Sequence, residues 1–284
     1  MSACDRPPDD APDLAVVAKH YDELDDAYRQ VWSDHAHHGW WRTGRESIQE
    51  AVIALVDLAG DAARVEAKTR LVDVGSGYGA TGRHLSRTRG ASVTSFTISP
   101  RQYEYARTVD AGDPRLHHEL RDWLDNGLPD ASFDAVIAIE SIAHMPPERA
   151  LVECARVLRR GGRLAILDLV AGDAVPKWQV NPLLRRMEEE SHLTPRPTLD
   201  AFVDQVRAAG FEIDEVRDLT SGVRGTWPRA VGQVARNLPR NPALRRFVFS
   251  DEYENDGFLR SILRMTVALR TGAVRYCLVS AVRT

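Results

Sequence analysis

A short apolar strand that runs directly into a glycine-rich turn restricts the fold of this 284-residue chain more than any other feature. The stretch VDVGSGYGATG spans residues 72–82 and places glycines at positions 75, 77 and 79. Glycines at such spacing allow a tight turn and a close approach of the backbone to a ligand. The spacing alone leaves open whether that ligand is a pyrophosphate or something else.

Apolar segments alternate with helical patterns along the following chain. RLVDVGSG, ASVTSFTIS, FDAVIAIES and RLAILDLV are apolar on both faces, which indicates a parallel sheet covered on both sides. PPERALVECARVLRRGG predicts a helix with prolines at its start and glycine at its stop. PTLDAFVDQVRAAGFEIDEVRDL adds a helix and a strand, and GAVRYCLVSAVRT a terminal strand. The sequence therefore predicts an α/β fold.

Departures from this alternation suggest how the chain is divided. Residues 1–13 are acidic and contain proline, which predicts a disordered tail, and residues 14–60 have a mostly helical pattern that predicts a cap. Residues 61–284 form the predicted core. Within it, polar insertions at about 172–197 and 221–271 are too long to be plain connections, so we expect a lid there.

Composition excludes several classes of function. A formal charge of -4 and a pI near 6.2 argue against general nucleic-acid or membrane-surface binding. Cys4, Cys154 and Cys277 form no CxxC pair, which predicts a reducing cytoplasm and neither a disulfide framework nor a zinc site. The N-terminus lacks the pattern of a signal peptide, and no apolar run reaches membrane-spanning length. A soluble cytoplasmic protein is predicted.

An acid about twenty residues after the turn would indicate a dinucleotide site, because it binds the ribose hydroxyls. The corresponding stretch here, SFTIS, has no carboxylate. A nicotinamide-dependent oxidoreductase therefore remains only as an alternative.

Three motifs that occur in order point to another class: VDVGSGYG, RDWLDNGLPDASFDAVIAIESIAHM and RVLRRGGRLAILDLV. Together they resemble class I S-adenosylmethionine-dependent methyltransferases. HYDELDDAYRQVWSDHAHHGWW and a second strand ending in TISPRQ are similar to the small-molecule branch, which includes tocopherol methyltransferases and antibiotic-pathway sugar O-methyltransferases. The resemblance implies a Rossmann-like, mostly parallel seven-stranded sheet with helices on both faces, and S-adenosyl-L-methionine as cofactor.

The resemblance also implies roles for individual residues around the cofactor. Gly75, Ser76 and Gly77 would let the backbone approach it, since a side chain at either glycine would fill that space. Thr97 and Gln102 would replace the usual acid by hydrogen-bonding the ribose or the adenosine.

Further cofactor contacts are implied from other parts of the chain. Asp122 would accept a hydrogen bond from the adenine amino group, with Trp123 against the ring face. Glu140 and Ser141 would border the methyl-transfer site, and Tyr21 would close over the cofactor's carboxylate.

His144 and Asp168 are the candidate catalytic residues, together with Glu140 at the methyl-transfer site. His144 follows a strand by a few residues and has a suitable pKa for a general base, and Asp168 lies near the end of the next apolar strand. In the sugar O-methyltransferases that the chain resembles, a histidine and an aspartate at matching positions serve catalysis, often beside a second histidine where Ala143 stands here. Alternatively, His144 caps the next helix, and Asp168 pairs with an arginine.

Other aromatic and histidine residues lead to further expectations. Trp178, Trp227 and Phe258 in the two insertions could line a pocket for an apolar or aromatic acceptor. His35, His37 and His38 lie too close together on a turn to converge on one ion, so no metal is predicted. Trp40 and Trp41 are expected to pack against a helix, although exposed aromatics there would permit a homo-oligomer. RRMEEE, residues 185–190, is expected to be a solvated helix face.

The leading interpretation is methyl transfer from S-adenosylmethionine to a small, fairly apolar or aromatic metabolite of specialised metabolism. His144 with Asp168 favours an oxygen acceptor. C-methylation of an aromatic or isoprenoid acceptor, a nicotinamide oxidoreductase, and a binding module that keeps the cofactor without transfer are the alternatives.

Overall fold

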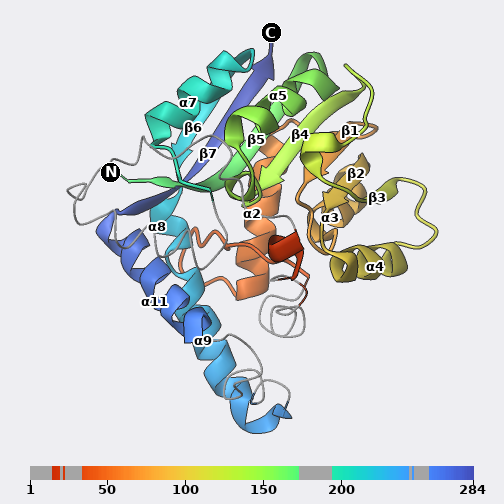
Figure 1. The fold of residues 1–284 in the computed structure, drawn as a ribbon. Coiled ribbons are helices and arrows are strands. Elements are labelled where there is room, and N and C mark those ends of the chain that lie inside the picture. The colour runs from red at the N-terminus through yellow and green to blue at the C-terminus, as the bar shows by residue number, and fades with distance from the viewer. Residues whose placement is uncertain (1–14, 20–21, 23–33, 173–193, 243–244, 246–255) are drawn as a thin grey trace.

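The computed structural model describes residues 15–19, 22, 34–172, 194–242, 245 and 256–284, whose centre is one seven-stranded sheet. The strand order is β3-β2-β1-β4-β5-β7-β6, and β7 alone runs antiparallel to its neighbours. Figure 1 shows this sheet with helices on both sides. The predicted α/β fold with a mostly parallel seven-stranded sheet is confirmed. Its strands are β1 Arg70–Val74, β2 Ser92–Thr97, β3 Leu116–Leu120, β4 Phe133–Ile139, β5 Leu158–Ala171, β6 Phe211–Asp218 and β7 Val274–Arg283.

Two apolar layers hold the helices on the sheet, because successive strand side chains point to opposite faces. In β4, Ile137 packs into one layer and Val136 into the other. Helices α2, α3 and α11 contribute to the first layer, and α5 and α7 to the second. The helices of the core are α2 Ile48–Ala62, α3 Ala80–Arg89, α4 Pro100–Val109, α5 Pro147–Val157 and α7 Leu199–Ala208.

Two local features differ from the sequence prediction. The sequence pattern did not indicate β3, because LHHEL is a polar strand at the edge of the sheet with no fully buried side chain. The predicted glycine stop of the helix that begins at Pro147 is wrong. That helix ends at Val157, and Gly161 and Gly162 lie within β5, between Leu158 and Arg163, which both pair with β4.

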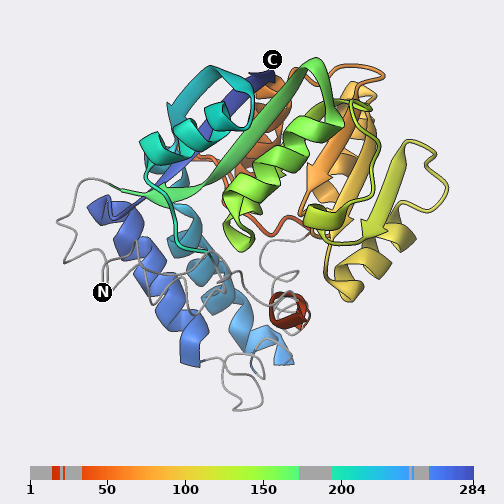
Figure 2. The ribbon, with the colours of Figure 1, turned by 45° about the horizontal axis from the view of Figure 1, so that its top comes forward.

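A helical segment lies between β6 and β7. It contains α8 Thr220–Val223, α9 Thr226–Asn237, the 3₁₀ helix η3 Leu238–Arg240 and α11 Asp256–Thr271. Figures 1 and 2 show α9 and α11 side by side, extending away from the sheet. Ala230 of α9 packs on Val52 of α2, so the segment is joined to the core at its base. In the described part of the chain, no helix is both long and apolar enough to span a membrane.

The two adjacent tryptophans pack against these helices. Trp41 is only 6 % exposed, its indole Nε1–H donates to the Glu46 carbonyl at 3.0 Å, and the Arg229 guanidinium lies 4.7 Å from its ring centroid. Trp40 is half-buried and packs against Gly222, where an added Cβ would lie 2.4 Å from the indole. The expected packing role is confirmed, and the suggestion of an exposed pair for a dimer contact is wrong, because Trp41 is buried.

A buried arginine connects Asp34, in the N-terminal part of the chain, to the core. Arg83 of α3 donates Nε–H to Asp110 at 2.6 Å, Nη1–H to Asp34 at 3.3 Å and Nη2–H to the Tyr78 carbonyl at 3.0 Å. Asp110 also contacts His118 Nε2 at 3.0 Å. Because both the guanidinium and the Asp110 carboxylate are withdrawn from water, each depends on the other for its hydrogen bonds.

We predict that Arg83→Leu destabilises the protein by about 3–5 kcal/mol, since it leaves the Asp110 carboxylate buried without its strongest donor. Urea or thermal unfolding measures the loss. Arg107→Leu is the matched control, because Arg107 pairs with Glu104 in full exposure to solvent. We expect the control to leave the unfolding midpoint nearly unchanged, and equal losses in both variants would contradict the assignment.

Candidate functional site

A pocket opens at the edge of the sheet where β1, β2 and β4 end, and we call it the edge pocket. Gly75 and Gly77 follow β1, Thr97 ends β2, and Glu140 follows β4. In open α/β sheets, ligands bind where neighbouring crossovers leave in opposite directions, as they do here between β1 and β4. The lining consists of Val17, Ala36, Gly75, Gly77, Phe96, Thr97, Ile98, Gln102, Arg121, Asp122, Trp123, Ile139, Glu140, Ser141, His144 and Met145.

Two glycines of the turn leave space for different things: Gly75 for Ser141 and Gly77 for a ligand. All three glycines have positive φ, +68° at Gly75, +54° at Gly77 and +72° at Gly79. A Cβ added at Gly75 would lie 2.3 Å from the Ser141 Cβ, so this glycine allows β1 and β4 to end close together. A Cβ at Gly77 would meet nothing nearer than Gln102 Nε2 at 4.0 Å. The expectation that a side chain would fill ligand space thus fits Gly77, whereas at Gly75 the space belongs to Ser141.

Ser76 holds the turn to the neighbouring strand and is not among the lining residues. Its backbone N–H donates to the Phe96 carbonyl at 2.7 Å, and its hydroxyl donates to the same oxygen at 3.2 Å. Ser76 therefore fixes the position of the turn relative to the end of β2.

Thr97 and Gln102 are joined to each other beside Gly77. The Thr97 hydroxyl donates to Gln102 Oε1 at 2.9 Å and accepts from the Ser99 N–H at 3.2 Å. Ser99 is the N-cap of α4, and its hydroxyl accepts from the Gln102 N–H at 3.2 Å. With Oε1 engaged, the Gln102 amide presents its NH₂ group as a donor on the side of Gly77.

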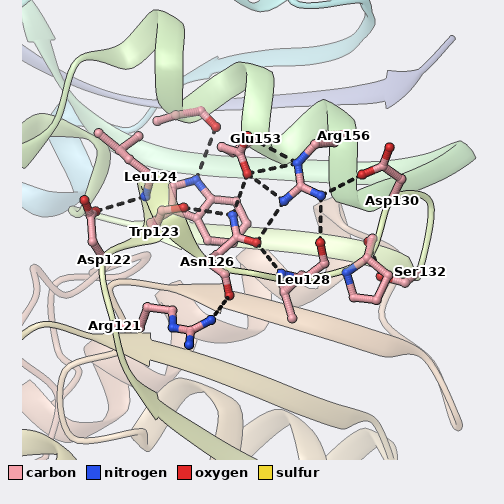
Figure 3. A network of polar contacts seen from close by, with 12 residues as sticks. Arg121, Asp122, Trp123, Leu124, Asn126, Leu128, Asp130, Ser132, Glu153 and Arg156 are labelled. Carbon is pink, nitrogen blue, oxygen red and sulfur yellow. Dashed lines mark hydrogen bonds and ion pairs between the residues drawn. The ribbon is translucent and has the colours of Figure 1, made fainter.

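Asp122 and Trp123, which follow β3, form one wall of the edge pocket. Asp122 caps the 3₁₀ helix η1, Trp123–Asp125, by accepting from the Leu124 N–H at 2.9 Å. The Trp123 indole donates to the Ala150 carbonyl at 3.2 Å, and its ring meets Phe96 edge-on. Figure 3 shows how Asn126, Glu153 and Arg156 secure the loop behind this wall. The indole is thereby fixed in orientation.

Glu140 and Ser141 lie at the end of β4 but differ in how their side chains are engaged. Glu140 has φ +54°, which is uncommon for a residue with a side chain. Its carboxylate accepts from the His38 N–H at 2.7 Å, His38 Nδ1–H at 2.8 Å and the Tyr276 hydroxyl at 2.9 Å. The Ser141 Oγ is buried and has no hydrogen-bond partner within the described residues, so it can receive a ligand.

His144 lines the edge pocket, whereas Asp168 lies behind the turn that carries it. His144 ends the 3₁₀ helix η2, Ile142–His144, and the next helix has Pro146 as its N-cap, so the alternative that His144 caps this helix is wrong. Asp168 in β5 accepts from the Ala143 N–H at 3.2 Å and the Leu169 N–H at 2.7 Å. Asp168 thus holds η2 in place through the Ala143 N–H without itself lining the edge pocket.

A smaller pocket, which we call the side pocket, contains Asp168 together with Thr194 and Arg196. Burial raises the pKa of Asp168 to about 6, although the Leu169 N–H and the charge of Arg196 act against this. The alternative of an arginine partner therefore holds in part. The side pocket shares η2 with the edge pocket, and its lining is Ile142, Ala143, Pro147, Asp168, Leu169, Val170, Thr194, Arg196, Pro197 and Phe202.

The N-terminal residues contribute Val17 and Ala36 to the edge pocket. Asp22 accepts hydrogen bonds from the Ser99 hydroxyl and the Arg101 N–H, which attaches this segment to the start of α4. Tyr21, Trp178, residues 185–190 and the tail at 1–13 lie outside the described residues, as does the side chain of Phe258. Trp227 lies beside the apolar core and is not among the lining residues of the edge pocket.

The three clustered histidines are buried. Burial lowers the pKa of His35 to about 2 and lowers that of His37, whose Nδ1 contacts the His38 carbonyl at 2.7 Å. Among the described residues no group of three or more His, Cys, Asp or Glu side chains is arranged to hold a metal ion.

Sequence reasoning missed several residues of the site. Arg121, Ile98 and Met145 line the edge pocket, and His38 and Tyr276 are connected to it through Glu140. Trp227 was expected to line an acceptor pocket, and its hydrogen bond to His38 was not foreseen. Arg121 and Met145 are the first and last residues of the motif RDWLDNGLPDASFDAVIAIESIAHM, and Ile98 lies within TISPRQ, so their position in these motifs could have indicated them. The link from Glu140 to His38 and Tyr276 spans more than a hundred residues in each direction, and no sequence pattern marks it.

Comparisons with known proteins identify methyltransferases, the class that the sequence motifs resemble. The model of a methyltransferase domain family matches residues 72–166. The 27-O-demethylrifamycin SV methyltransferase of Amycolatopsis mediterranei is 33 % identical over 75 % of this chain and 80 % of its own length. The chloroplastic tocopherol O-methyltransferase of Arabidopsis thaliana is 28 % identical over 76 % and 68 %.

Solved structures share the fold over nearly the whole chain. The [4+2]-cyclase SpnF superposes with a TM-score of 0.77 at 25 % identity, covering 96 % of this chain and 97 % of that one. A mycolic acid cyclopropane synthase complexed with S-adenosylhomocysteine gives a TM-score of 0.84 at 20 % identity, covering 96 % and 99 %. The chain belongs to the S-adenosylmethionine-dependent methyltransferase family, and the resemblance read from its motifs is confirmed.

The raised pKa of Asp168 predicts a definite dependence of stability on pH. In the unfolded chain this carboxyl ionises near its usual value of 3.8, but in the folded protein only near 6. The folded state therefore binds more protons between about pH 4 and pH 6, and stability falls as the pH rises through that range. The loss amounts to about 3 kcal/mol.

Asp168→Asn should remove this loss. We expect the unfolding free energy of the variant, relative to wild type, to improve by about 3 kcal/mol between about pH 4 and pH 6 in chemical denaturation. Asp134→Asn is the control of opposite sign. Although Asp134 is partly buried, hydrogen bonds from Arg70 and Arg159 lower its pKa to about 2, so its contribution disappears on acidification below about pH 4. A pH-independent difference for Asp168→Asn would contradict the prediction.

Proposed function

We propose that the edge pocket binds S-adenosyl-L-methionine and that the protein transfers its methyl group to a hydroxyl of a small, fairly apolar or aromatic metabolite. The observation that supports this most strongly is the meeting of Gly77, Gln102, Asp122 and Ser141 in one pocket from four separate parts of the chain. The O-methyl products implied by the names of the rifamycin and tocopherol relatives favour an oxygen acceptor.

The pocket has groups that fit the cofactor's chemistry. The open space beside Gly77 and the Ser141 hydroxyl, which has no hydrogen-bond partner among the described residues, mark where a ligand can approach. Gln102 would donate to the ribose, Asp122 would accept from the adenine amino group with its second oxygen, and Trp123 would border the ring. When bound, the cofactor supplies an activated methyl group on a sulfonium. The protein's task is then to position the acceptor in line and to exclude water.

We propose His144 as the general base that removes the acceptor proton. It lines the edge pocket at the end of η2, and Asp168 fixes that turn through the Ala143 N–H. Asp168 acts in this proposal as a positioning residue, because its carboxylate already accepts two backbone hydrogen bonds. Glu140 is also a positioning residue rather than a base, since three donors occupy its carboxylate.

Other aspects of the protein follow from the same proposal. We place it in the cytoplasm, where the buried thiols of Cys154 and Cys277 would stay reduced. The helical segment from Thr220 to Thr271 would act as a lid over the acceptor.

A second candidate function follows from the likeness to a [4+2]-cyclase at 25 % identity over nearly the whole chain. In that case the chain would keep the cofactor pocket and convert its substrate without methyl transfer. Incubation with S-adenosylmethionine and a panel of phenolic and macrocyclic hydroxyl compounds separates the two functions. Formation of S-adenosylhomocysteine supports methyl transfer, and a rearranged product with unchanged cofactor supports cyclisation.

Gly77→Ala is predicted to weaken S-adenosylhomocysteine binding at least about tenfold, because the new methyl group projects into the open side of the edge pocket. Isothermal titration calorimetry measures the affinity, with NAD as a parallel injection. Gly44→Ala is the matched control: it has a similar positive φ of +81° but no atoms within 4 Å and lies outside the pocket. Both variants should lose similar stability, about 1–2 kcal/mol. Unchanged affinity in Gly77→Ala, or binding of NAD instead, would overturn the cofactor assignment.

His144→Ala is predicted to keep S-adenosylhomocysteine affinity within about twofold while turnover with a confirmed acceptor falls about 10²–10⁴-fold. Transfer of a labelled methyl group measures turnover. Raising the pH should partly restore the rate of the variant, since the acceptor hydroxyl then ionises without a base. A folded variant that loses cofactor binding would show that His144 has been assigned to the wrong side of the pocket.

A further inference from the structure

The carboxylate of Glu140 connects the edge pocket to two distant segments through one histidine. Glu140 and its neighbours Ile139 and Ser141 line the pocket, and the Glu140 N–H donates to the Leu167 carbonyl at 2.8 Å. The side chain bonds to the backbone N–H and the imidazole Nδ1–H of His38. The end of β4 is thereby joined to the segment whose Ala36 lines the same pocket.

His38 continues the connection to the helical segment between β6 and β7. Its Nε2 accepts from the indole N–H of Trp227 in α9 at 2.9 Å. An indole nitrogen only donates, so Nε2 must be unprotonated and the proton is on Nδ1, which faces Glu140. One imidazole therefore bridges a carboxylate on β4 and an indole on α9, and both of its nitrogens are engaged.

The protonation states of Glu140 and Tyr276 keep the hydrogen bonds around His38 in place: Glu140 accepts and Tyr276 donates. Burial acts to raise the pKa of Glu140, but the hydrogen bonds that His38 donates to the carboxylate act against burial, and the pKa is lowered. Burial and the charge of Glu140 raise the pKa of the Tyr276 phenol, so its hydroxyl remains a donor. The His38 ring packs against Trp227 and Tyr276, with ring centroids 5.6 and 5.4 Å apart.

The conformation of Glu140 indicates that this arrangement matters to the pocket. A left-handed φ of +54° at a residue with a long side chain is unfavourable, and it persists only where the surroundings enforce it. The three hydrogen bonds to its carboxylate provide that enforcement. A shift in the position of His38 therefore moves the backbone at Glu140, which lines the edge pocket. A shift of that backbone likewise moves His38.

We propose that His38 is a positioning residue that couples occupancy of the edge pocket to the docking of α9. A ligand that holds the wall around Glu140 and Ser141 stabilises the orientation of His38, which stabilises the hydrogen bond to Trp227 and with it α9. α9 then docks preferentially on protein that already holds the cofactor. This inference rests on the proposed cofactor pocket and adds an order of events to it.

Hydrogen–deuterium exchange tests the coupling with S-adenosylhomocysteine as the probe, and no acceptor is needed. In the full-length wild-type protein, saturating probe should slow exchange in the turn at residues 75–79, at the end of β4 and also in α9. We expect α9 amides to exchange about five- to tenfold more slowly than without the probe, within the usual range of coupling between sites. The peptide covering Thr226–Asn237 reports on α9.

Two substitutions each remove the hydrogen bond between Trp227 and His38, one by removing its donor and the other by removing its acceptor. Trp227→Phe removes the indole donor and keeps an aromatic ring, whereas His38→Asn keeps a donor for Glu140 and loses the acceptor for Trp227. In both variants the probe should still protect the glycine turn, but α9 should no longer respond. The double variant should behave like either single variant, since both remove the same hydrogen bond.

Trp41→Phe is the matched control. It also removes an indole hydrogen bond, the one of 3.0 Å to the Glu46 carbonyl, from a buried ring that contacts Arg229 of α9 but makes no hydrogen bond to Glu140 or His38 among the described residues, so it tests whether loss of any indole hydrogen bond next to α9 removes the response. Its α9 response should equal that of wild type.

The possible outcomes separate the two proposals. If calorimetry shows that the probe does not bind wild type, the proposed function fails. If the probe binds and protects the turn while α9 is unaffected, or if α9 responds equally in Trp227→Phe and His38→Asn, the coupling is wrong and the cofactor pocket stands. Loss of the response in Trp41→Phe would also overturn the specific role of His38.

Discussion

The sheet order places the ends of β1 and β4 side by side, and the architecture of the site depends on this contact. After β1 the chain forms β2 and β3 on one side, then returns to form β4 on the other. The two strands end so close together that Gly75 has room for no side chain beside Ser141. Because the crossovers that follow β1 and β4 leave in opposite directions at this point, neither of these two connections covers the edge between the strands, and a ligand can enter there.

Some polar groups at that edge make hydrogen bonds within the protein, whereas others face the pocket. The site therefore contains two kinds of residue. Ser141 and the NH₂ group of Gln102 face the pocket and can contact a ligand. Glu140 and Asp168 accept hydrogen bonds from the protein and hold the ends of β4 and η2 in place. Carboxylates at strand ends look alike in a sequence, but burial and donors decide which of them can act on a substrate.

The predictable part of the site follows from periodicity at strand ends. Gly75, Thr97 and Glu140 each end or follow an apolar strand, and parallel strands bring such positions to one edge. β3 was not predicted, because an edge strand needs no continuous apolar pattern. The sequence pattern also does not indicate that Gly161 and Gly162 lie in a strand, since β5 pairs with β4 on both sides of them, at Leu158 and at Arg163, and this tertiary contact outweighs the usual preference of glycine to end a helix.

The sequence by itself determined the α/β class, the glycine turn, the set of residues at the carboxyl edge and the methyltransferase family, because all of these depend on local order along the chain. Only the tertiary structure decided that Gly75 makes room for Ser141, that Asp168 lies behind the turn of His144, and that His38 joins Glu140 to Trp227. These contacts join residues far apart in sequence. The directions and burial of their side chains are set by packing of the whole domain, and no local pattern encodes them.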